Sequence, residues 1–90
     1  MTVKAKDNEA IMNRLRRIEG QVKGIQKMLE EEKNCSDILV QIAAVRSAIN
    51  SVGGLILENY MKNCLKNYLD GETDEDTLNE LVNTMVKYTK

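Results

Sequence analysis

Apolar residues recur at helical spacing along most of the chain. In the first third they step alternately by four and three residues, at Ile11, Leu15, Ile18, Val22, Ile25 and Leu29. This spacing is the heptad seam of packed helices, and it predicts a helix over residues 8–33. Three glutamates at 30–32 place negative charge in its last turn, where it opposes the helix dipole, so we expect that end to fray.

A second, longer helix is predicted over residues 35–69. The run Asn-Cys-Ser-Asp at 34–37 resembles an N-cap followed by an acidic third helical residue. The apolar stepping then continues at Ile38, Ile42, Val45, Ile49, Val52 and Ile56. At 1.5 Å per residue the helix would be about 50 Å long, which is too long for its short neighbours to cover.

Gly53 and Gly54 lie halfway along this second helix and leave two interpretations open. Each glycine costs a helix about 1 kcal/mol, so the pair could break it into a hairpin. Alternatively, the glycines and the small residues near them let another helix approach closely. We favour close packing because the apolar stepping crosses the glycines without a change of phase.

A third helix is predicted over residues 73–88. The run Thr-Asp-Glu-Asp at 73–76 provides a cap and an acidic first turn. One face of the helix carries Leu78, Leu81, Val82 and Met85. With residues 1–7 as a disordered tail, the pattern describes a single all-α domain over residues 1–90.

Composition points to a partner chain and to an intracellular location. Ninety residues bury barely enough apolar surface to fold alone, and this chain has no Phe or Trp to fill a core. The net charge of −1 hides seven basic residues against three acidic ones between 4 and 27, and six acidic residues with no basic one between 70 and 80. No run approaches the roughly 18 consecutive apolar residues of a membrane span, and no secretion signal follows the N-terminus, so we expect a cytoplasmic protein.

The chain has two cysteines, Cys35 and Cys64, and no histidine. On a continuous helix the two residues would be about 43 Å apart, whereas a disulfide tolerates Cα separations only up to about 7 Å. They nevertheless lie on the same helix face to within about 20°. If two copies pack antiparallel about a two-fold axis between Ile49 and Asn50, each Cys35 lies opposite the partner's Cys64.

The two thiols should differ in their surroundings. Cys35 lies in the first helical turn, at the positive end of the helix dipole and beside Lys33, and both features favour a thiolate. Cys64 lies deep in the helix and lacks the dipole's help. Cys35 is therefore the expected attacking sulfur and Cys64 the resolving one. The plainer interpretation, that both cysteines merely pack, is equally compatible with their spacing.

Two segments, "RLRRIEGQVKGIQKMLEEEKNCSDILVQIAAVRSAINSV" and "LENYMKNC", resemble the copper-sensitive operon repressor family, the CsoR/RcnR/FrmR group of bacterial regulators. The likeness covers about residues 13–81. It implies three helices per protomer, an antiparallel four-helix-bundle dimer and a tetramer. It also implies a sensing site made of Cys35 from one protomer and Cys64 from another. The family's histidine, four residues before the second cysteine, is replaced here by Tyr60.

The missing histidine separates the branches of this family. Nickel and cobalt sensors use several histidines, and formaldehyde sensors use an N-terminal proline, which this chain also lacks. The persulfide-sensing, CstR-like branch keeps only the two cysteines, so the resemblance implies di-, tri- or tetrasulfide bridges and no cofactor. The alternative is a Cu(I)-responsive repressor with a two-thiolate site, because Cu(I) is a soft ion. Tyr60 would be a poor ligand, since a phenol with a pKa near 10 hardly ionises at neutral pH.

Double-stranded operator DNA is the expected partner. The candidate contacts are Arg14, Arg16, Arg17, Gln21, Lys23 and Arg46. A basic helix face is more often merely solvated, but Arg14 and Arg17 match the arginine positions by which the family binds operators, and a tetramer would repeat the charge four times. Bridging the thiols should release the DNA. A helical adaptor is the alternative from another class, and an enzyme is disfavoured because no histidine base accompanies the cysteines.

Overall fold

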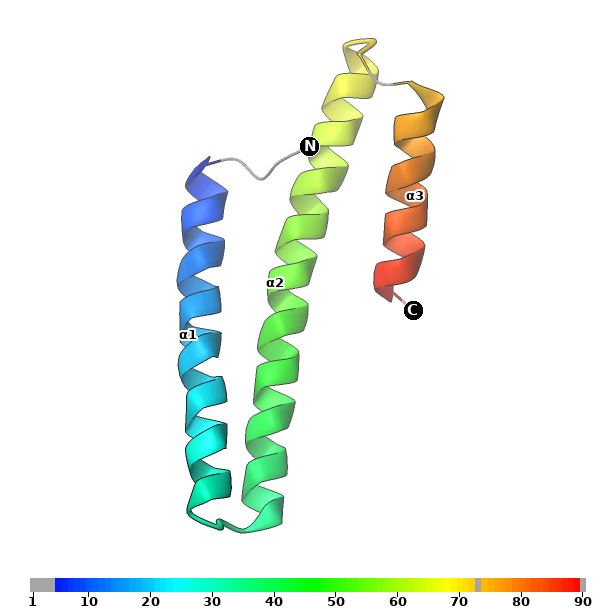
Figure 1. Ribbon diagram of the computed structural model, residues 1–90. Helices are drawn as coiled ribbons and strands as arrows, with labels where there is room; N and C mark the ends of the chain where they lie inside the picture. Colours follow the sequence, from blue (N-terminus) through cyan, green and yellow to red (C-terminus); the bar gives the residue numbers. More distant parts are fainter. Residues whose placement is uncertain (1–4, 73, 90) are drawn as a thin grey trace. The chain divides into compact units, whose positions relative to one another are not determined.

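The computed structural model describes residues 5–72 and 74–89. It contains three α-helices, α1 (Ala5–Glu30), α2 (Cys35–Leu69) and α3 (Glu75–Thr89) (Figure 1). No strand occurs among the described residues, so the expected all-α class with three helices is confirmed. Residues 5–7 belong to α1, and the disordered tail predicted there is wrong; residues 1–4 lie outside the described part.

The chain divides into two compact units that share α2. The first covers residues 5–54, and the second begins at Leu55. The boundary between the units falls inside the continuous helix α2, and each unit is a helical hairpin. The single domain expected from the sequence stays a prediction.

The first unit pairs α1 with the first part of α2 (Figure 1). Its buried apolar side chains are Ile11 and Ile18 of α1 and Ile38 and Val52 of α2. All four occupy the helical spacing seen in the sequence, so the two helices bury part of the predicted seam. Val22 and Leu29 belong to the same seam but remain 41% and 60% exposed. The hairpin alone therefore covers only part of its apolar surface.

The end of α1 is fixed by a Schellman turn. The backbone N–H of Lys33 donates to the carbonyl of Met28 at 2.9 Å, and the N–H of Glu32 donates to that of Leu29 at 3.2 Å. Glu32 takes the left-handed position of the turn, with φ of 54°. The helix therefore stops at Glu30, earlier than the expected residue 33.

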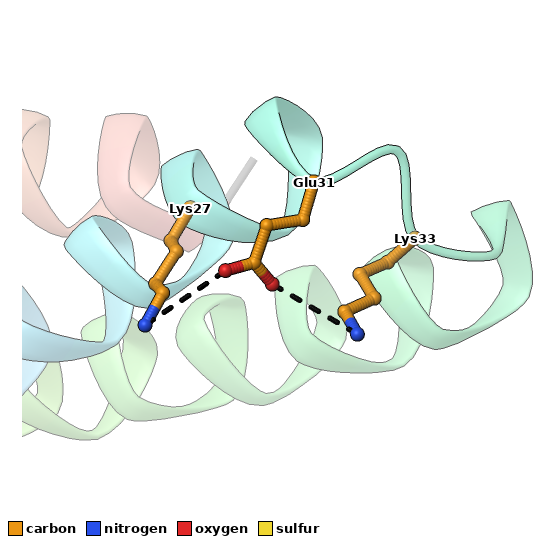
Figure 2. Close-up of polar contacts among 3 residues, drawn as sticks. All are labelled: Lys27, Glu31 and Lys33. Atoms are coloured by element: carbon orange, nitrogen blue, oxygen red, sulfur yellow. Dashed lines mark ion pairs between the residues drawn. The ribbon is translucent and has the colours of Figure 1, made fainter.

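The negative charge at this helix end is partly compensated by lysines. Figure 2 shows the Glu31 carboxylate between the ammonium groups of Lys27 and Lys33, each at 3.8 Å. Such exposed pairs contribute little each. Together with the Schellman bonds they explain why the residues after α1 form a defined turn instead of the frayed end that the glutamates suggested.

α2 begins at Cys35 because Asn34 caps it, as the sequence predicted. The side-chain oxygen of Asn34 accepts hydrogen bonds from the backbone N–H of Ser36 at 3.0 Å and from its hydroxyl at 3.1 Å. The Asn34 carbonyl accepts from the N–H groups of Asp37 and Ile38, both at 3.1 Å. Cys35 is thus the first residue of the helix.

α2 runs through Gly53 and Gly54 without interruption, so a hairpin at the glycines is wrong. A Cβ atom added to Gly54 would meet nothing within 4 Å. Within the described part of the chain, no neighbour uses the close approach that this glycine permits. A helix packed closely on Gly54 would have to come from a second chain.

The second unit pairs the remainder of α2 with α3 (Figure 1). α2 ends in another Schellman turn, in which the N–H of Glu72 donates to the Asn67 carbonyl at 2.8 Å. Gly71 takes the left-handed position, with φ of 75°. Here the sequence supplies the residue that this backbone conformation favours.

The cap of α3 is Asp74. Its side-chain oxygen accepts a hydrogen bond from the backbone N–H of Thr77 at 2.8 Å. The helix consequently begins at Glu75, two residues later than expected, and Thr73 lies outside the described residues. No described residue of α3 is fully buried.

Large apolar side chains are exposed along α2, including Leu39 and Val40 at 63% each. By length and composition α2 is able to cross a membrane: the mean hydropathy of its most apolar 18-residue window is 1.4, and 11% of that window is buried. Counting consecutive apolar residues missed this property, because polar residues interrupt the run. One such helix is weak evidence for a span, since core helices of water-soluble proteins also meet the criterion.

Candidate functional site

Cys35 presents an exposed thiol at the start of α2. The Asn34 cap holds this turn, so the cysteine lies on a rigid helix end and not on a loop. Lys33, which the sequence placed as a cation beside the thiol, pairs with Glu31 at 3.8 Å. Part of its charge is therefore compensated, and the helix terminus is the more direct positive influence on Cys35.

Cys64 has the opposite environment, because only 1% of its surface is exposed. The half-buried Leu57, Tyr60 and Asn67 lie seven residues before, four before and three after it, on the same side of α2. Burial raises the pKa of the Cys64 thiol, and the Glu80 carboxylate of α3 raises it further. At neutral pH Cys64 is thus a protonated, shielded thiol. This environment fits the predicted resolving role better than an attacking one.

Pairing of Cys35 with Cys64 of a second chain was predicted on the condition that one continuous helix carries both cysteines. α2 meets this condition. A stripe of exposed side chains continues from Cys35 along the helix at steps of three, four and seven residues; we call it the α2 stripe, and it comprises Cys35, Leu39, Ile42, Ile49 and Ile56. Ile42, Ile49 and Ile56 are each 40–45% exposed. A second copy of α2, packed antiparallel so that its Cys35 lies opposite Cys64, would cover this stripe.

The candidate DNA contacts of α1 fall on two different sides of the helix. Arg14, Arg17 and Gln21 follow one another at steps of three and four and share one side, whereas Arg16 and Lys23, seven residues apart, share another. The four basic side chains are exposed. The sequence analysis treated these five α1 residues as one set of DNA contacts. One DNA duplex cannot contact both sides of the helix equally.

Gln21 and Arg46 differ from the other candidates. The side-chain oxygen of Gln21 is buried and has no hydrogen-bond partner in the described part of the chain. Gln21 is therefore directed partly into the hairpin, where an oxygen cannot reach DNA. Arg46 lies on α2 between Ile42 and Ile49, on the side of the α2 stripe. A partner helix packed on this stripe would contact Arg46 and compete with DNA for its side chain.

Sulfur is the donor that this site offers a metal. No group of three His, Cys, Asp or Glu side chains comes together among the described residues. Tyr60, at the family's histidine position, is half-buried. Met61, 40% exposed, precedes Cys64 by three residues on α2. Thiolate and thioether donors select soft ions such as Cu(I).

Sequence reasoning missed the influence of Glu80 on Cys64. It noted the acidic residues between 70 and 80 only as a concentration of negative charge. The available signal was the short link between α2 and α3, which turns the chain back and returns α3 alongside the second half of α2. The side of α3 that faces Cys64 could not be read from its charges.

Comparisons with known proteins agree with the fold. Residues 7–87 match the family described as metal-sensitive transcriptional repressor. The chain is 42% identical over 86 residues to the copper-sensing transcriptional repressor CsoR of Bacillus subtilis, covering 96% of this chain and 85% of that protein. It is 54% identical over 56 residues to the copper-sensing repressor RicR of Mycobacterium tuberculosis, covering 62% and 56% of the two chains.

A solved structure gives the same result in three dimensions. The copper-sensing repressor CsoR with Cu(I) from Geobacillus thermodenitrificans superposes with a TM-score of 0.87 at 41% identity, covering 100% of this chain and 94% of the other. The three helices and the two cysteines on one long helix define a thiol-bearing helical regulator. The chain belongs to the CsoR/RcnR/FrmR family of metal-sensitive transcriptional repressors. The copper named for these relatives gives no support to the expectation of a protein without a cofactor, and it agrees with the Cu(I) alternative.

Proposed function

We propose that this repressor senses reactive sulfur through a dithiol formed by Cys35 of one chain and Cys64 of its partner, and releases operator DNA when the two become bridged. The observation that carries the proposal is the absence of histidine from a chain that keeps both cysteines on one helix. Sulfur transfer between thiols needs a thiolate but no imidazole ligand.

The site requires an assembly of chains. An antiparallel pair of α2 helices about a two-fold axis near Ile49 and Asn50 would cover the α2 stripe and place a Cys35 opposite each Cys64. Two dimers would form the proposed tetramer. The same packing accounts for an α2 that is apolar enough for a membrane span in a DNA-binding, cytoplasmic protein.

The chemistry balances without a further oxidant. The Cys35 thiolate attacks the outer sulfur of a persulfide RSSH and becomes Cys35–SSH, while RS⁻ leaves. Cys64 of the partner subunit then attacks the Cys35 sulfur, a disulfide forms, and the outer sulfur leaves as sulfide with the proton of Cys64. Each extra sulfur first loaded on Cys35 lengthens the bridge by one atom, which gives the tri- and tetrasulfides.

The test is DNA release combined with mass. Wild-type protein bound to a duplex selected from random DNA should dissociate after polysulfide treatment, as followed by fluorescence anisotropy. Intact mass spectrometry should show two chains joined with zero, one or two added sulfurs. Cys35→Ala should stay bound. Release of Cys35→Ala at the wild-type level would contradict the proposal.

Cu(I) is the second candidate inducer, favoured by the copper-sensing function named for the relatives. The donor set fits a soft ion, because it contains two thiols and no imidazole. Stoichiometric Cu(I) binding that survives a competing chelator, together with DNA release and no added sulfur, would favour copper over persulfide.

Operator contact is proposed for the side of α1 that carries Arg14 and Arg17. Alanine at either position should weaken binding to all duplexes and lower the salt dependence of log K by about 1 for each phosphate that is no longer neutralised. Arg16→Ala, on the other side of the helix, is the matched control. Loss of binding for Arg16→Ala alone would place the DNA on the opposite side.

A further inference from the structure

We propose that Met61 is the third sulfur ligand of a Cu(I) site that Cys64 and the partner's Cys35 complete. This inference rests on Cu(I), the second inducer proposed above, and names the ligand that takes the place of the missing histidine. It assigns a role to an exposed apolar residue that packing within the chain leaves unexplained.

The position of Met61 allows it to act with Cys64. Side chains three residues apart on a helix are neighbours, with Cβ atoms about 5–6 Å apart. Met61 is 40% exposed while Cys64 is 1% exposed, so a solvent-accessible methionine stands one helical turn before the buried cysteine. Three rotatable bonds allow a methionine sulfur to turn toward a neighbour.

The chemistry of Met61 suits Cu(I) better than that of Tyr60. A thioether is a soft donor that needs no deprotonation, and Cys and Met are the residues that select Cu(I). The phenol of Tyr60 is a hard oxygen donor that must first lose a proton. Two thiolates and one thioether would therefore give three sulfur ligands without any imidazole.

The chain provides matched controls for this assignment. Met12 on α1 is 43% exposed, close to the 40% of Met61, but lies in the other unit. Met85 on α3 is half-buried in the same unit as Met61. Leucine conserves most of the volume of methionine and costs little stability, so Met61→Leu, Met12→Leu and Met85→Leu remove one sulfur each from a folded chain.

The experiment loads the full-length oligomer with Cu(I) under anaerobic conditions and measures X-ray absorption and competition with a Cu(I) chelator. Wild type and Met12→Leu should show three sulfur neighbours around copper. Met61→Leu should show two, with a Cu(I) affinity lower by at least about tenfold, because even outer-shell changes at metal sites cost about 10–100-fold.

The outcomes separate this inference from the proposed function. Three sulfurs and unchanged affinity in Met61→Leu would overturn the role of Met61 while Cu(I) sensing stands, as would loss of the third sulfur in Met85→Leu instead. A wild-type protein that binds no Cu(I), or one whose Cu(I) binding survives Cys35→Ala, would refute the thiolate copper site itself and Met61 with it.

Discussion

At the scale of single residues, two helix ends use the same turn with different residues in its left-handed position. Glu32 holds φ of 54° and Gly71 holds φ of 75°. A side chain in this conformation costs about 1 kcal/mol, which glycine avoids. Glu32→Gly should therefore raise the free energy of unfolding by up to about 1 kcal/mol and the melting temperature by a few degrees at fixed protein concentration.

Gly71→Ala is the opposite experiment at the matching position. No atom lies within 4 Å of an added Cβ there, so the variant meets no clash and reports the backbone conformation alone. It should lower the free energy of unfolding by about 1 kcal/mol. Calorimetry should show the melting temperature raised in Glu32→Gly and lowered in Gly71→Ala. A change in the same direction for both variants would contradict this explanation.

The two thiols should differ in their reaction with iodoacetamide. Cys35 is exposed and Cys64 is buried, and burial raises the Cys64 pKa above its ordinary value of 9.0. At any pH below that pKa the folded protein holds less Cys64 thiolate than the unfolded chain does. Mass spectrometry over time should show Cys35 modified first, with the Cys64 rate rising at higher pH than in denatured protein. Equal rates at neutral pH would refute this.

The same pKa shift has a consequence for stability. Because the folded-state pKa of Cys64 is raised, its contribution is fully present below the unfolded value and is lost as pH rises through the folded one. Unfolding free energy should fall above about pH 9, and Cys64→Ser should show a smaller fall over the same range.

At the scale of helices, α3 depends on its cap. Hydrogen bonds from Thr77 hold the pKa of Asp74 below its ordinary 3.8. The stabilisation is therefore present above pH 3.8 and is lost as pH falls through the lower folded-state value. Asp74→Ala should abolish this acid dependence and lower the protection of the Thr77 amide in hydrogen exchange. Asp76→Asn, in the same turn, should leave that protection in place.

At the scale of the whole molecule, assembly through the α2 stripe is the central prediction. Ile49 is 45% exposed and lies next to the proposed two-fold axis. Ile49→Glu would bury two carboxylates near each other and should dissociate the oligomer at micromolar concentration in analytical ultracentrifugation. Ile49→Leu keeps an apolar side chain and should remain assembled. An Ile49→Glu protein of unchanged mass would place the interface elsewhere.

The sequence predicted the helices well and their ends less well. The predicted bounds of α2, residues 35–69, agree with the structure, in which Asn34 caps the start and Gly71 takes the left-handed position after the end. The sequence analysis placed the end of α1 too late, since no local rule favours Glu32 in a left-handed turn. The sequence identified both cysteines, but not the burial of Cys64 or the effect of Glu80 on it. The face that α3 turns toward α2 is a tertiary property that charges alone do not encode.

α3 brings the Glu80 carboxylate into the electrostatic range of Cys64, although none of its own described side chains is fully buried. A short helix held by half-buried contacts opens in a subglobal fluctuation that costs less free energy than unfolding the protein. Each opening takes the Glu80 carboxylate away from Cys64 and removes its effect on the thiol. The surroundings of the buried sulfur therefore depend on a conformational equilibrium, and whatever stabilises or loosens the last 15-residue helix shifts that equilibrium without contacting either sulfur.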